Sequence, residues 1–132
     1  MLGLMQSHPL LISNLIEFAA RHHGDGEIVS RRTEGDLHRY TWKDVAARSR
    51  QVANALDASG LAAGDRVGTL AWNGYRHLEL YFGVSGSERV LHTINPRLLP
   101  EQIAWIVSHA EDRIVCFDTT FLPIIKIGRA HV

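Results

Sequence analysis

Short apolar runs alternate with amphipathic segments from residue 60 onward. The apolar runs predict strands near residues 66–72, 90–94 and 113–117, and the segments between them have the apolar spacing of helices. Strands that are apolar throughout are typical of a parallel sheet that is covered on both faces. Strands and helices that alternate along the chain are typical of βαβ units. This pattern therefore predicts an α/β fold with a mostly parallel sheet.

The first part of the chain has a different pattern. Leu11, Leu15 and Phe18 recur at helical spacing. Ser13 is a suitable cap for the start of this helix, and Gly24 is suited to its end. A single amphipathic helix is therefore expected before the first strand.

A β-hairpin is expected near residues 27–41. The strand-like runs EIVSRR and LHRYT are separated by the turn-rich TEGD. Thr41 and Asp44 then have the spacing of a capping box, in which Asp replaces the more common Glu. The helix that they open, WKDVAARSRQVANALDASG, is expected to end at Gly60. The predicted fold is thus an N-terminal hairpin followed by alternating strands and helices, in one domain or part of one.

Composition and charge narrow the classes of function. The chain has 132 residues, of which 45% are hydrophobic and 21% are charged, as in ordinary globular proteins. Lys and Arg total 14, and so do Asp and Glu, so no net field attracts nucleic acid or an anionic membrane. The start of the chain lacks the features of a signal peptide, and no apolar run approaches the roughly 20 residues of a membrane span. We expect a cytoplasmic protein without a transmembrane segment or a nucleic-acid partner.

Few residues suggest metal or nucleophile chemistry. Cys116 is the single cysteine, which excludes an internal disulfide, and its apolar neighbours predict a small core residue. His22 and His23 are adjacent and point in different directions. His77 and Glu79 are two positions apart, which does not bring them to one face of a helix. Both pairs are interpreted as solvated surface residues, and no metal site is expected.

Other candidate residues favour structural roles. His92, in the middle of a predicted strand, is either a hydrogen-bonded core histidine, the favoured reading, or a contact to a substrate pocket. Trp42, Trp72 and Trp105 are expected to pack in the core. The stretches HHGDGE, GLAAGD and GVSGSE lack the spacing of GxxxxGKS/T or GxGxxG, so no nucleotide-binding loop is predicted.

Several segments in a fixed order resemble one family. HRYTWKDVAARSRQVANALDASGLAAGDRVGTLAWN resembles the opening of the adenylate-forming acyl-CoA synthetases, in which a Thr-capped helix leads to a turn and a strand. LYFGVSG, HTINPRL, EQIAWIVSHAEDRIVCFD and TFLPII follow in the family's order. HTINPRL is most similar to the bacterial medium- and long-chain fatty-acyl-CoA ligases. The resemblance covers residues 10–125 and identifies residues 1–126 as part of the N-terminal AMP-binding-enzyme domain.

The resemblance implies a reaction whose machinery lies mostly outside this chain. In the family, ATP and a fatty acid form an acyl-adenylate and pyrophosphate with Mg²⁺, and the CoA thiol then displaces AMP. The complete enzyme is expected to bind fatty acid and CoA and to form a homodimer. The family's phosphate loop and catalytic lysine have no match here, so no catalytic residue is carried over. The chain alone is expected to be inactive and to bind ATP, CoA and Mg²⁺ weakly at most.

One binding residue is carried over from the resemblance. Arg97 belongs to the NPRL turn, whose arginine lies near the phosphates of the CoA nucleotide in the family's thioester-forming state. An exposed guanidinium just before the start of a helix suits phosphate. The alternative is a solvated arginine that merely follows a proline turn.

Two features depart from the family's pattern. Glu88 and Arg89 stand where the family usually has small residues, so the packing between helix and strand is expected to differ there. Residues 127–132, IGRAHV, are not expected to continue the helix that TTFLPIIK begins. The codons ATC-GGA-AGA-GCA-CAC-GTC of a common sequencing adapter encode this segment, which predicts a non-native tail.

Two classes of function follow from the sequence. The chain is either a fragment of a fatty-acid–CoA ligase that is inactive alone, or a stand-alone, non-catalytic binding domain that shares the fold. The DNA on either side of the stop codon would distinguish them.

Overall fold

The computed structural model describes residues 3–129. Its elements follow one another in the order α1 (Ile12–His22), β1 (Glu27–Arg31), β2 (Leu37–Thr41), α2 (Trp42–Ala58), β3 (Arg66–Leu70), α3 (Tyr75–Ser85), β4 (Val90–Thr93), α4 (Pro100–Ala110), β5 (Ile114–Phe117), a 3-10 turn (Thr119–Phe121) and α5 (Leu122–Arg129). The predicted hairpin and the alternation of strands and helices are both confirmed.

The three later strands form a parallel sheet in the order β4-β3-β5. Val67 in the central strand lies opposite Leu91 on one side and Ile114 on the other. Strands β1 and β2 form a separate antiparallel pair, with Glu27 opposite Thr41. The mostly parallel sheet predicted from the apolar runs is confirmed.

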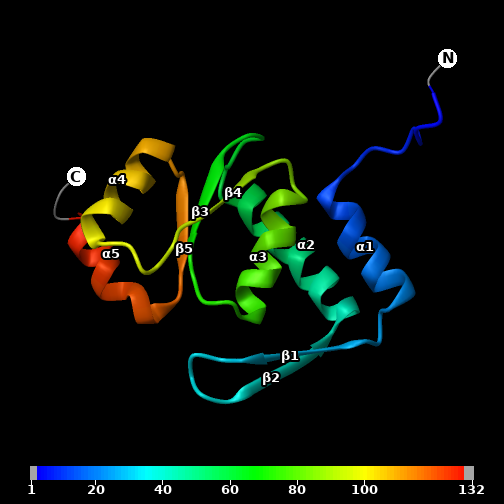
Figure 1. Cartoon of the computed structure of the whole chain (residues 1–132), viewed down its shortest axis with the longest axis horizontal. Helices are drawn as coiled ribbons and strands as arrows, with labels where there is room; N and C mark the ends of the chain where they lie inside the picture. The colour runs from blue at the N-terminus through cyan, green and yellow to red at the C-terminus, as the bar shows by residue number, and fades with distance from the viewer. Residues whose placement is uncertain (1–2, 130–132) are drawn as a thin grey trace.

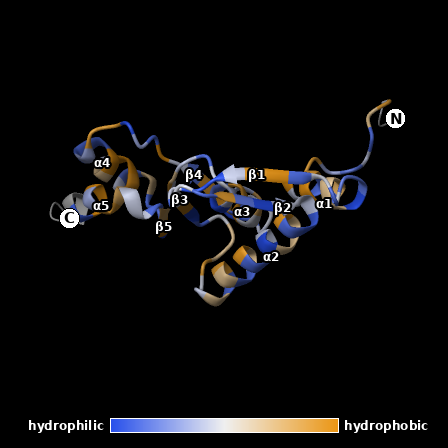
Figure 2. Cartoon of the chain, turned by 90° about the horizontal axis from the view of Figure 1, so that it is seen from below, coloured by the Kyte–Doolittle hydropathy of each residue, from blue (hydrophilic) through white to orange (hydrophobic). Residues whose placement is uncertain are grey.

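Helices cover both faces of the parallel sheet (Figure 1). Helices α2 and α3 cover one face, where the buried core consists of Leu56, Leu61, Val67 and Val84. Helices α4 and α5 cover the other face, and both carry hydrophobic stretches (Figure 2). The buried core there consists of Leu70, Ile94, Ile103 and Phe121. Burial on both faces explains why the strand sequences are apolar throughout.

The hairpin and α1 pack around the start of α2. Tyr40 and Val45 share a buried cluster with Ile16 of α1. Thr41 and Asp44 form the predicted capping box, with the Asp44 carboxylate accepting the Thr41 N–H at 2.8 Å. The cap joins the end of the hairpin directly to the start of α2, because Thr41 belongs to both.

The apolar stripe expected to bury α1 points outward. Leu15 and Phe18 are exposed, whereas Ile16 is buried. The predicted cap is also wrong, because α1 begins at Ile12 with Leu11 before it. The face that contacts α2 is set by tertiary packing, which overrides the local apolar spacing.

Helix α5 extends to Arg129, so the expectation that the helix stops before residue 127 is wrong for residues 127–129. Gly128 lowers helix stability by about 1 kcal/mol relative to alanine but does not end a helix as proline would. Residues 130–132 lie outside the described part of the chain.

Arg89, one of the two residues that depart from the family's pattern, is buried. Its guanidinium donates hydrogen bonds to the Asp57 carboxylate at 2.7 Å and to the Leu61 carbonyl at 2.6 Å. Glu88 has a φ of 61°, in the left-handed region, and its carbonyl accepts the Gly64 N–H at 2.8 Å. The two residues therefore connect the start of β4 to the loop that follows α2.

Candidate functional site

The carboxyl ends of the parallel strands meet at one edge of the sheet, which is where open α/β sheets bind ligands. Strand β3 leads there to Trp72 and Asn73, β4 leads to Asn95 and Arg97, and β5 leads to Asp118. This edge gathers polar side chains from three separate segments. This edge is therefore the candidate functional site.

The turn after β4 is fixed at its first residues. Ile94 is buried, and its N–H donates to the Thr69 carbonyl of β3 at 2.9 Å. The Asn95 side-chain oxygen accepts the backbone N–H of Arg97 at 3.0 Å. The Asn95 carbonyl accepts the N–H of Leu98 at 3.3 Å. The side-chain bond forms an Asx turn, and the backbone bond closes a β-turn over the same residues.

The turn leads directly into α4. The N–H of Leu99 donates to the Gln102 side-chain oxygen at 3.0 Å, and Pro100 occupies the first turn of the helix. Proline is well suited there because its missing N–H would have no partner inside the helix. Leu98 packs against the core cluster beneath α4. The backbone is thus held on both sides of Arg97.

Arg97 itself is exposed, and among residues 3–126 its guanidinium has no ion-pair or hydrogen-bond partner. Most other arginines of the chain pair with a carboxylate, as Arg76 pairs with Glu34 at 2.8 Å. A guanidinium offers five N–H donors in a planar arrangement that matches phosphate oxygens. The geometry therefore suits binding of an anion at this turn.

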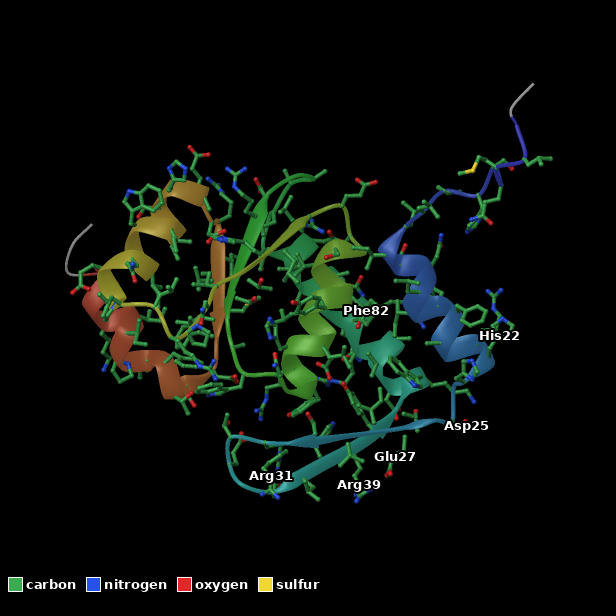
Figure 3. All side chains as sticks on the ribbon, viewed as in Figure 1. His22, Asp25, Glu27, Arg31, Arg39 and Phe82 are labelled. Atoms are coloured by element: carbon green, nitrogen blue, oxygen red, sulfur yellow. The ribbon has the colours of Figure 1, made fainter. Side chains whose placement is uncertain are left out.

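The tip of the hairpin reaches the same edge of the sheet. Arg76, at the start of α3, donates to Glu34 in the hairpin turn, and this bond lowers the pKa of Glu34 to about 2. The pair is exposed, so its contribution to stability is small. Farther along the hairpin, Arg39 pairs with Glu27 at 2.7 Å, and Arg31 lies nearer the tip (Figure 3).

Asp118 connects the ends of β3 and β5. Its carboxylate accepts the backbone N–H of Trp72 at 2.8 Å, and the Trp72 indole N–H donates to the Thr120 hydroxyl at 3.0 Å. Trp72 is partly exposed and packs on Phe121, with ring centroids 4.8 Å apart. Trp105 is 63% exposed and stacks on His109. The expectation of buried tryptophans is therefore wrong for Trp72 and Trp105.

His92 is a partly buried, hydrogen-bonded histidine, which agrees with the structural role favoured from the sequence. Its Nδ1 lies 2.8 Å and 3.0 Å from the two oxygens of Asp112, whose side chain is fully buried. A carboxylate can only accept, so Nδ1 carries the proton. Gly68, beside His92 in the sheet, leaves room for this pair, because a Cβ there would lie 2.8 Å from an Asp112 oxygen.

His77 and Glu79 are buried, which contradicts their interpretation as surface residues. His77 is 8% exposed and its Nε2 lies 3.0 Å from the Thr69 hydroxyl. Glu79 is 3% exposed and accepts from Arg48 of α2 at 2.7 Å. Helix α3 is covered by the sheet, by α2 and by the hairpin, so residues two positions apart are both enclosed.

The buried His77 predicts a pH dependence of stability. Burial lowers the pKa of His77 below its ordinary value of 6.5, and a hydrogen bond to the Trp72 backbone opposes the shift. The unfolded chain therefore binds the proton more readily, and the free energy of unfolding should fall as the pH falls below about 6.5. In urea unfolding between pH 7.5 and 5.5, His77→Gln should remove part of this decline, while His22→Gln at an exposed position should not. Parallel curves for the original chain and His77→Gln would contradict the prediction.

The remaining candidates carry little chemistry. Burial raises the pKa of the Cys116 thiol, which makes it a weaker nucleophile at neutral pH. Within the described part of the chain, no three His, Cys, Asp or Glu side chains come together as a metal site would require. No described helix is long and apolar enough to cross a membrane.

Comparisons with known proteins agree on one family. A sequence model of the AMP-binding enzymes matches residues 16–128. The chain is 54% identical over 129 residues to a 3-methylmercaptopropionyl-CoA ligase of Ruegeria lacuscaerulensis, and the match covers 98% of this chain and 24% of that protein. It is 53% identical over 125 residues to a medium-chain-fatty-acid–CoA ligase of Ectopseudomonas oleovorans, which covers 95% of this chain and 23% of that protein.

A solved structure agrees with the sequence comparisons. A fatty acyl CoA synthetase of Mycobacterium tuberculosis is similar in structure, with a TM-score of 0.78 and 26% sequence identity. The similarity covers 91% of this chain and 24% of that one. The chain therefore spans about a quarter of the length of the relatives that it matches.

Proposed function

Because the chain belongs to the family of AMP-binding enzymes, we propose that it forms the N-terminal quarter of an acyl-CoA ligase. The observation that carries the proposal is the 54% identity over 98% of the chain to a protein named for this activity. The complete enzyme would activate a fatty acid with ATP and transfer the acyl group to the thiol of CoA. The relative from Ectopseudomonas oleovorans supports a fatty acid as the substrate.

Within this reaction, we propose that Arg97 binds a phosphate of CoA. The support is the exposed guanidinium, the fixed backbone of the turn and the position at the carboxyl edge of the sheet. This quarter of the enzyme would contribute a binding residue and no catalytic residue. ATP would supply the leaving group that activates the acid.

The proposal has further parts that stay predictions. Mg²⁺ would accompany ATP, and the complete enzyme would form a homodimer in the cytoplasm. We also propose that residues 127–132 are not native, although α5 includes the first three of them.

The proposed function predicts different activities for the chain and for a complete enzyme that contains it. The 132 residues alone should show no fatty-acid-dependent exchange of pyrophosphate into ATP. Residues 3–129 contain no glycine-rich phosphate loop, so nothing there stabilises the charge that develops on the phosphates. A chimera in which residues 1–126 replace the matching segment of the Ectopseudomonas oleovorans ligase should show both exchange and acyl-CoA formation.

Two results would contradict this prediction. Exchange by the isolated chain above the background without fatty acid would show that it is catalytically complete. A chimera that folds, as judged by its circular dichroism and cooperative unfolding, but does not activate fatty acids would show that the chain is not an interchangeable part of such a ligase.

A further inference from the structure

Within the turn after β4, the Asn95 side chain holds the backbone N–H of Arg97. The Asn95 oxygen accepts the N–H of Arg97 at 3.0 Å, and among residues 3–129 this is the one hydrogen bond that the Arg97 backbone N–H makes. The neighbouring backbone groups have other anchors, because Ile94 donates to β3 and Leu98 donates to the Asn95 carbonyl. Asn95 is exposed, so its role is not to fill the core.

The Arg97 side chain has no hydrogen-bond or ion-pair partner among residues 3–126. The ordered backbone of the turn fixes the point from which the Arg97 side chain projects, so less backbone freedom is lost when a ligand binds. A solvated arginine on an unordered turn would not have this property. The Asx turn thus orders the backbone that carries Arg97.

We propose that Asn95 is a positioning residue that orients Arg97 toward the phosphate of CoA. This proposal rests on the proposed function of Arg97. The Asn95 carboxamide holds the backbone of Arg97 through the N–H bond and does not itself contact CoA. Its effect on CoA therefore passes through Arg97 and disappears when the guanidinium is absent.

The test measures the KM for CoA and the rate of pyrophosphate exchange in the chimera, for Asn95→Ala, Arg97→Ala and the double variant. Asn95→Ala should raise the KM for CoA about three- to tenfold, as expected for one lost neutral hydrogen bond. It should leave the exchange rate within about twofold. In the Arg97→Ala background it should change the KM by less than about twofold, because the two effects are coupled.

Two further variants serve as controls. Asn95→Ser should restore most of the CoA affinity, because a serine hydroxyl forms the same kind of turn more weakly. Asn54→Ala removes an exposed asparagine of α2, outside this edge of the sheet, and it should not change the KM for CoA.

The outcomes separate the two proposals. If Arg97→Ala leaves the KM for CoA unchanged, the proposed function of Arg97 is wrong. If Arg97→Ala raises the KM and Asn95→Ala does not, the positioning role alone is overturned. Additive effects of the two substitutions would show that Asn95 acts independently of Arg97, which would overturn the positioning role. Equal losses of exchange and CoA affinity, with a lower melting temperature, would show that Asn95 is only structural.

Discussion

Replacing His92 with leucine should lower the free energy of unfolding by about 3–5 kcal/mol, the cost of leaving a buried charge without its partner. The Asp112 side chain is fully buried, and the His92 imidazole lies within 3.0 Å of both of its oxygens. Small domains are stable by about 5–15 kcal/mol, so this loss is a large fraction of the total. Urea unfolding followed by circular dichroism at pH 7 measures it.

A second substitution tests the cause of the loss. Adding Asp112→Asn to His92→Leu removes the buried charge, so the double variant should be more stable than His92→Leu alone. If the double variant is less stable than His92→Leu alone, the His92 ring contributes by packing and not by pairing with the carboxylate.

Gly68→Ala should also destabilise the chain, because the new Cβ would lie 2.8 Å from an Asp112 oxygen.

The sequence predicts the features that depend on neighbouring residues. The hairpin, the parallel strands and the Thr41–Asp44 capping box all have short-range signals, and all are confirmed. The strand predicted near residues 66–72 ends at Leu70, because the N–H of Trp72 donates to the side chain of Asp118 instead of to a neighbouring strand. A contact that spans more than forty residues has no local signal.

The sequence predicts less well which helix residues are buried, because burial also depends on segments that are distant in the chain. The sequence predicts His77 and Glu79 as surface residues because they are polar and two positions apart, but both are buried since several elements enclose α3. The apolar spacing predicts Leu15 as a core residue, but α1 packs on α2 through the face that carries Ile16. Only the three-dimensional arrangement shows which face of each helix is covered.

The sequence indicates one part of the candidate site, and only the structure shows the rest. The resemblance of its turn to a family motif makes Arg97 a candidate binding residue. The order of the turn comes from the structure, although Asn before Pro is a recognised turn signal that could have indicated the role of Asn95. The pairing of His92 with Asp112 connects a strand to a residue twenty positions away, which the sequence does not reveal.

Arg97→Ala in the chimera should weaken the use of CoA about ten- to a hundredfold, because loss of one charge-assisted contact costs about 1.5–3 kcal/mol. Adenylation of the fatty acid precedes the binding of CoA in the proposed reaction, so pyrophosphate exchange should be nearly unchanged. The effect should also shrink at high salt, since an exposed guanidinium is screened.

Arg113→Ala provides the matched control for this prediction. Arg113 is also exposed, and replacing it with alanine removes the same charge. Arg113 precedes β5, however, and lies at the opposite edge of the sheet. It should leave the KM for CoA within about twofold of the unmodified chimera, because a distant exposed charge is largely screened. A similar rise for both variants would indicate a general effect of net charge.

The most direct test of the account compares the two half-reactions of the chimera with and without the Arg97 side chain. Pyrophosphate exchange reports adenylation, and the CoA concentration dependence of acyl-CoA formation reports thioester formation. The account predicts that Arg97→Ala keeps the exchange rate and raises the KM for CoA about ten- to a hundredfold. An equal fall in both half-reactions, or no change in the KM for CoA, would contradict it.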